Sequence, residues 1–150
     1  MVDIERFCCN PANLCVLSVD ATFELCNYYL TFATYRNMML ETKSRRNPVF
    51  VRPAILHKSK LERSYYLLPS EMVQCHPPCA GVLVVGTDGE QNLSNPLLNV
   101  FQSAMHLHCN MLMKDNTKSK LSSLGVPTVV ANEYVADIFG RGEEAGLVHS

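Results

Sequence analysis

The sequence contains no tryptophan and no long run of apolar residues. None of its apolar segments approaches the ~20 residues that a membrane-spanning helix needs. The first ten residues, MVDIERFCCN, carry acidic side chains and lack the apolar centre of a secretory signal. These absences predict a protein without a secretion signal and without a membrane partner, located in the nucleus or the cytoplasm.

An excess of positive charge is also missing. Thirteen Lys and Arg residues face fourteen Asp and Glu residues, which gives a formal net charge of −1. Proteins that bind nucleic acid over their whole surface are strongly basic, so this class is excluded for the chain as a whole. The basic residues gather locally in Lys43–Arg46 and Lys114–Lys120. A solvated loop and a solvated helix face are the simplest interpretations of these two groups.

The seven cysteines are odd in number and irregular in spacing. Without a secretory signal, reduced thiols are the expected state. A zinc site is an alternative, because thiolates and imidazoles are zinc ligands. It would combine two groups of residues: Cys75, His76 and Cys79 in QCHPPC, and His106, His108 and Cys109 in HLHC. Their spacing does not repeat, so buried thiols and hydrogen-bonded histidines are the preferred interpretation.

Hydrophobic patterning predicts an α/β chain. Apolar and β-branched runs predict strands at 14–25, 28–40, 48–57 and 81–85, and a short strand in MHLHC. Helices are expected from residue 58 to Pro69, from a cap at Ser94 or Asn95 to about residue 105, at 110–124 and at 128–139. Pro53 predicts an edge position or a bulge for the third strand. The order predicts one mixed sheet of three antiparallel strands and a parallel fourth, with flanking helices, in a single domain over residues 1–150.

Two aspartates stand at unusual places in the strands. Asp20 interrupts the apolar run CVLSVDATFEL, and Asp88 follows directly after the apolar segment VLVVGT. If the first and fourth strands are neighbours, the two carboxylates meet at one edge of the sheet. Converging carboxylates suit Mg²⁺ or Mn²⁺ and metal-assisted chemistry on phosphodiesters. A turn residue at Asp88 and a hydrogen-bonded acid at Asp20 are the simpler alternatives.

Four segments together resemble the transposase domain of Mutator-like elements: CVLSVDATFELCNYYLTFATYRNMMLE, PVFVRPAILHKSKLERSYYLLPSEMV, VVGTDGE and AMHLHCNMLMKDNTKSKL. The resemblance extends from about Cys15 to Phe139 and depends on the order and spacing of the segments. It implies a ribonuclease-H-like fold and a DDE-type enzyme that cleaves and transfers DNA strands with Mg²⁺ or Mn²⁺. DNA at transposon ends would be the partner, and assembly into homo-oligomers is compatible with this class.

The resemblance assigns roles to particular residues. It implies that Asp20 in VDATF and Asp88 in TDG are catalytic metal ligands. It also places a His-x-x-Cys element at His106 and Cys109, although Leu112 occupies the position at which the family has a further histidine. This departure puts the role of the element in question.

The third catalytic acid of the family has no clear counterpart. Glu133, Glu143 and Glu144 lie in the right part of the chain, but none matches the expected context, so the third acid is unknown. The sequence therefore predicts a fragment or remnant of a transposase core, with an incomplete C-terminal part and no activity as this 150-residue chain. The alternatives are a non-catalytic, domesticated module that binds DNA or protein through the same fold, and a zinc-stabilised interaction domain.

Overall fold

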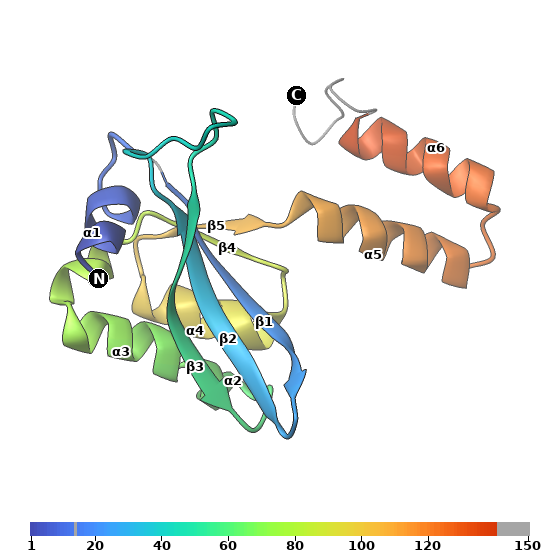
Figure 1. The fold of residues 1–150 in the computed structure, drawn as a ribbon. Helices are drawn as coiled ribbons and strands as arrows, with labels where there is room; N and C mark the ends of the chain where they lie inside the picture. The colour runs from blue at the N-terminus through green and yellow to red at the C-terminus, as the bar shows by residue number, and fades with distance from the viewer. Residues whose placement is uncertain (14, 141–150) are drawn as a thin grey trace. The chain divides into compact units, whose positions relative to one another are not determined.

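The computed structural model describes residues 1–13 and 15–140. The chain divides into two compact units, Met1–Leu107 and His108–Ser150, and each is described by itself. The helices of the first unit are α1 (Val2–Cys8), α2 (Glu62–Tyr65), α3 (Leu67–Cys75), the 3₁₀ helix η1 (Pro77–Gly81) and α4 (Gln91–Val100) (Figure 1). Its strands are β1 (Leu17–Leu25), β2 (Tyr28–Arg36), β3 (Val49–His57), β4 (Val84–Thr87) and β5 (Met105–His108). The last residue of β5, His108, begins the second unit. The second unit contains α5 (Asn110–Ser123) and α6 (Thr128–Phe139).

The strands form one five-stranded sheet in the order β3-β2-β1-β4-β5. β1 pairs antiparallel with β2, and β2 pairs antiparallel with β3, whereas β1 pairs in parallel with β4. The predicted α/β class, the mixed sheet and the adjacency of the first and fourth strands are therefore confirmed. Pro53 lies in β3 at the edge of the sheet, and the β2–β3 register shifts between Phe32 and Thr34. Both features fit a residue that cannot donate a backbone hydrogen bond.

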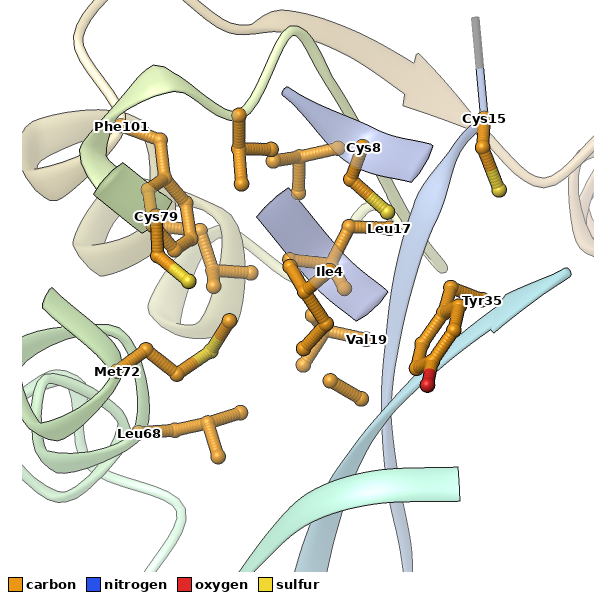
Figure 2. Packing of buried hydrophobic residues seen from close by; sticks show 14 of the residues in the cluster. Ile4, Cys8, Cys15, Leu17, Val19, Tyr35, Leu68, Met72, Cys79 and Phe101 are labelled. Atoms are coloured by element: carbon orange, nitrogen blue, oxygen red, sulfur yellow. The ribbon is translucent and has the colours of Figure 1, made fainter. Parts of the chain in front are cut away.

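One face of the sheet carries the hydrophobic core. Side chains alternate along a strand, so Leu17 and Val19 are buried while Ser18 and Asp20 between and beyond them are exposed. The helices α1, α3 and α4 lie on the buried face and contact β2, β3 and β4 respectively (Figure 1). Figure 2 shows side chains of these helices and strands meeting in this core; those labelled include Ile4, Leu17, Val19, Tyr35, Leu68, Met72 and Phe101.

The helix α1 was not predicted from the sequence. Its buried side chains are Ile4, Phe7 and Cys8, which follow the spacing of one helix face over only two turns. The Tyr35 hydroxyl donates to Asp3 Oδ2 at 3.3 Å and fixes this helix to the sheet. A second contact joins Glu5 to His76 at 2.7 Å. Tertiary packing, which a short segment does not reveal, stabilises this helix.

Several predicted helix boundaries were wrong, two of them near prolines. The helix expected to stop at Pro69 is instead divided at Tyr66, and Pro69 lies in the first turn of α3, where a missing N–H costs little. Ser94 does not cap the next helix, because α4 already begins at Gln91 and contains Pro96. The Ser94 hydroxyl donates to the Glu90 carbonyl oxygen at 2.7 Å, one turn earlier in the helix. The helix ends at Val100 rather than near residue 105.

The second unit is a pair of helices that contact each other. Gly125 follows α5 with φ +78°, a conformation that glycine adopts without strain, and the predicted end of this helix is confirmed. Ala131, Val135 and Phe139 are buried at four-residue spacing on α6. Lys114 Nζ lies 5.7 Å from the centre of the Phe139 ring and joins the two helices. Among the described residues, the helices are all too short or too polar to span a bilayer.

Candidate functional site

Asp20 lies on the exposed face of β1, in the centre of the sheet. It is paired with Phe32 of β2, and its neighbour Val19 points into the core. The strand on its other side is β4, which runs parallel to β1. An exposed acid on a central strand is compatible with the alternating pattern and leaves the carboxylate accessible to solvent.

The parallel register relates Asp20 to Asp88. Leu17 pairs with Val85 and Ser18 with Gly86, so partners differ by 68 in residue number. The same offset separates Asp20 from Asp88, which lie two residues after Ser18 and two residues after Gly86. Extended past Thr87, where β4 ends, this register would put the two positions level on neighbouring strands, about 4.8 Å apart.

Gly86 indicates which face of the sheet is concerned. A Cβ atom added to Gly86 would lie 3.3 Å from Ser18 Oγ, on the exposed face that also carries Asp20. Val85 and Thr87 on either side of Gly86 are buried, whereas Asp88 is half-buried. The absence of a side chain at Gly86 therefore leaves the exposed face open beside Ser18, directly before the two aspartates.

A hydrogen-bonded turn holds Asp88. The backbone N–H of Glu90 donates to Asp88 Oδ1 at 2.9 Å, and the N–H of Gly89 donates to Thr87 Oγ1 at 3.2 Å. Gly89 has φ +89°, which an L side chain rarely adopts. The interpretation of TDG as a turn is thus correct. Asp88 Oδ1 closes the turn and fixes the carboxylate, and Oδ2 of the same carboxylate can still act as a ligand.

His106 supports this turn from the neighbouring strand. Its Nε2 lies 2.8 Å from the Thr87 hydroxyl, which is almost completely buried. The predicted His-x-x-Cys element is split between the two units, because His106 belongs to the first and Cys109 to the second. Cys109 is exposed and precedes α5 as its N-terminal cap residue.

Two further residues near Asp88 were missed in the sequence. Glu90 is half-buried and follows in the same turn. Tyr65 of α2 is 1% exposed, and its hydroxyl has no hydrogen-bond partner within the described part of the chain. Burial, and then the negative charges of Glu90 and Asp88, raise the pKa of Tyr65 to about 12. The hydroxyl is therefore protonated at neutral pH and is available as a donor.

Replacing Tyr65 by phenylalanine should leave the free energy of unfolding unchanged or raise it by about 1 kcal/mol. Burying an unpaired hydroxyl costs about 1–3 kcal/mol, and the substitution removes that hydroxyl while keeping the ring. The ring contact with His57, at 5.0 Å between centroids, is retained. Urea unfolding followed by circular dichroism measures the difference.

Tyr35→Phe is the matched control. Tyr35 is also buried, but its hydroxyl donates to Asp3, so this variant should lose about 1 kcal/mol. A loss in Tyr65→Phe as large as that in Tyr35→Phe would mean that the Tyr65 hydroxyl has a partner, and the idea of an available donor would be abandoned.

The other residues predicted as ligands belong to other elements or lie outside the described residues. Glu133 is exposed on α6 in the second unit, and Glu143 and Glu144 lie outside the described residues. In the cysteine-rich loop, His76 is engaged with Glu5, Cys79 is buried and Cys75 is exposed. Within residues 1–13 and 15–140 no three His, Cys, Asp or Glu side chains are grouped so as to hold a metal ion. The described residues thus give no support to the zinc alternative.

No protein-family model matches the sequence, and no curated protein matches it. The resemblance to Mutator-like transposases therefore depends on the four sequence segments alone.

Proposed function

We propose that this chain forms a ribonuclease-H-like DDE transposase core of the Mutator-like type, in which Asp20 and Asp88 together bind a divalent cation. The observation that carries the proposal is the parallel β1–β4 register, in which the two aspartates have the same offset as the paired residues. Two carboxylates on neighbouring strands supply the hard oxygen ligands that Mg²⁺ and Mn²⁺ prefer.

The strand order supports the same fold. A sheet of three antiparallel strands, with a parallel strand beside the first, is what the family resemblance implies. The sites in open α/β sheets lie beyond the carboxyl ends of parallel strands, which is where Asp88 follows β4.

The residues around the two aspartates fit an ion of this kind. The bond from Glu90 N–H orients the Asp88 carboxylate, and Thr87 with His106 anchors the turn from β5. Asp20 is exposed and can meet a substrate from solvent. A bound divalent ion would supply Lewis-acid stabilisation of the charge on a reacting phosphodiester. The protein's part is then to hold two oxygen ligands in fixed positions at a solvent-accessible edge.

Two lysine–tyrosine pairs at this end of the sheet suit nucleic acid. Lys58 Nζ lies 5.5 Å from the centre of the Tyr28 ring, and Lys60 Nζ lies 5.4 Å from that of Tyr29. The Asn92 amide of α4 donates to the Lys60 carbonyl oxygen at 3.3 Å, which ties this segment to the helix that follows Asp88. Lysines can contact phosphates and aromatic rings can stack on bases, so DNA is the substrate class we propose.

Mn²⁺ should raise the melting temperature of the wild-type chain, and Asp88→Asn should remove most of the rise. A ligand that binds only the folded state, present at about ten times its Kd, adds about 1.4 kcal/mol, which corresponds to about 3–6 °C for a protein of this size. Asp20→Asn should behave like Asp88→Asn, because both carboxylates are needed. Differential scanning fluorimetry with and without Mn²⁺ gives the three shifts.

Asp115→Asn is the control, because Asp115 is an exposed acid on α5 in the second unit. It should keep the wild-type response to Mn²⁺. If Asp88→Asn and wild type respond equally, the metal does not bind at this edge and the proposal fails. A plasmid-nicking assay on the same variants distinguishes an active enzyme from a non-catalytic module. We expect no nicking. If the wild-type chain nicks DNA and Asp20→Ala abolishes the activity, a third acid must be present, and Glu133 and Glu90 are the first candidates.

A further inference from the structure

Two cysteines from successive elements meet at the edge of the core. Cys8 ends α1 and Cys15 precedes β1, and both are buried, at 1% and 6% exposure. The Cys15 N–H donates to the Phe7 carbonyl oxygen at 3.3 Å, and the Leu83 N–H donates to the Cys8 carbonyl oxygen at 2.9 Å. The backbones on both sides of the pair are therefore fixed. Figure 2 labels both side chains in the same cluster.

The two thiols influence each other. The neighbouring Cys8 thiol lowers the pKa of Cys15, and Cys15 together with burial raises the pKa of Cys8. The charge of Arg36 further lowers the pKa of Cys15, while burial opposes it. The Cys15 thiol donates to the Arg36 carbonyl oxygen at 3.3 Å, so the side chain is held between β2 and α1. The arrangement combines a nucleophilic sulfur with a second thiol beside it.

A cavity gives small molecules access to Cys15. It has a volume of about 420 Å³, and its lining includes Asn13, Cys15, Ser18 and Arg36. A hydroperoxide is far smaller than this volume, and polar groups line part of the wall. Cys8 is not among the lining residues, so an oxidant that enters the cavity meets Cys15 first.

We propose that Cys15 is a site of oxidation by hydroperoxides and that Cys8 resolves the product into a Cys8–Cys15 disulfide. In the first step the Cys15 sulfur attacks the peroxide, the O–O bond breaks, and sulfenic acid and water (or an alcohol) form. In the second step the Cys8 sulfur attacks the sulfenic sulfur, a disulfide forms, and a second water leaves. The two thiols lose two electrons in total, and the hydroperoxide accepts them.

The other cysteines are less suited to this chemistry. Burial raises the pKa of Cys9 to about 11, and it also raises that of Cys79, which is completely buried. Cys26, Cys75 and Cys109 are exposed. The distinction predicts selective oxidation at a buried pair, which is opposite to what exposure alone would produce. This inference is independent of the proposed metal site.

The test is peptide mapping of the full chain after brief treatment with hydrogen peroxide in the presence of a chelator. The mass of the wild-type chain should fall by that of two hydrogen atoms, and digestion should yield a peptide cross-linked through Cys8 and Cys15. A reductant should cleave this cross-link. The Cys9→Ser variant should give the same cross-link. It shows that the cross-link is made by Cys8 and not by the adjacent Cys9. Cys8→Ser should instead leave a sulfenic acid at Cys15, which dimedone traps as one adduct. Cys15→Ser should give neither product, and Cys26→Ser should behave as wild type.

If the variants at Cys8 or Cys15 do not fold, the peptide map of the wild-type chain alone still tests the proposal. Thermal unfolding of each variant shows whether it can be compared. If folded wild type is oxidised first at Cys26, Cys75 or Cys109, with no Cys8–Cys15 peptide, the proposal is wrong. A link from Cys8 to Cys79 in place of Cys15 would overturn it equally.

Discussion

Replacing Leu17 by alanine is expected to lower the free energy of unfolding by about 3 kcal/mol. Substitutions of buried leucine by alanine cost about 2–5 kcal/mol, since apolar contacts are lost and a cavity remains. Leu17 is completely buried and pairs with Val85, so the cavity would open at the junction of β1 and β4. Because domains are typically stable by only about 5–15 kcal/mol, this loss would be a large fraction of the total.

Leu56→Ala is the matched control for this experiment. Leu56 belongs to β3 of the same sheet but is 61% exposed, so its replacement should change the free energy of unfolding by less than about 0.5 kcal/mol. Urea unfolding of both variants, followed by circular dichroism, provides the comparison. A similar loss in both variants would show that the core does not lie on the face assigned to Leu17.

Strand pattern and proline position made most of the sheet predictable. Alternation around Leu17 and Val19, and the β-branched content of β2, identify strands because side chains point to opposite faces at every second residue. Pro53 identified the edge strand for a chemical reason that does not depend on context. The crossover rule predicted a parallel fourth strand, but the adjacency of the first and fourth strands was inferred only from the need to bring Asp20 and Asp88 together.

The errors arose where distant contacts decide the outcome. Helix α1 is short and charged, and its burial depends on Tyr35 and His76 from later elements. At Pro96 the local preference for a first-turn proline gives way, because the turn closed by Asp88 starts α4 earlier. Local propensity is a weak guide when a hydrogen bond elsewhere fixes where the helix begins.

The candidate site was predictable only in part. Asp20 and Asp88 were identified because an acid in or directly after an apolar strand is unusual. Tyr65 gave no such signal, since a tyrosine on a helix face is ordinary until its unpaired hydroxyl is seen. The contact between Thr87 and His106 likewise joins two strands that are separated along the chain by α4. Groups that act together through the fold leave no local pattern.

Replacing Gly86 by valine is expected to destabilise the protein by about 2 kcal/mol and to abolish the Mn²⁺ response. A Cβ atom at this position would lie 3.0 Å from Val16 Cγ1 and 3.3 Å from Ser18 Oγ, and overpacking of this kind costs about 1–3 kcal/mol. The strain would separate β4 from β1, and with it Asp88 from Asp20. Urea unfolding and the Mn²⁺ melting shift measure the two effects.

Val16→Ala provides the rescue that connects this prediction to its cause. It removes Cγ1, the atom nearest to the added Cβ, so the double variant should lose less stability than the sum of the two single losses, by about 0.5–1 kcal/mol. Part of the Mn²⁺ shift should return with it, because the two strands can approach each other again. Strictly additive losses would show that Val16 is not the obstacle. An intact Mn²⁺ shift in Gly86→Val would show that metal binding does not depend on the spacing of β1 and β4, and the shared site at Asp20 and Asp88 would have to be given up.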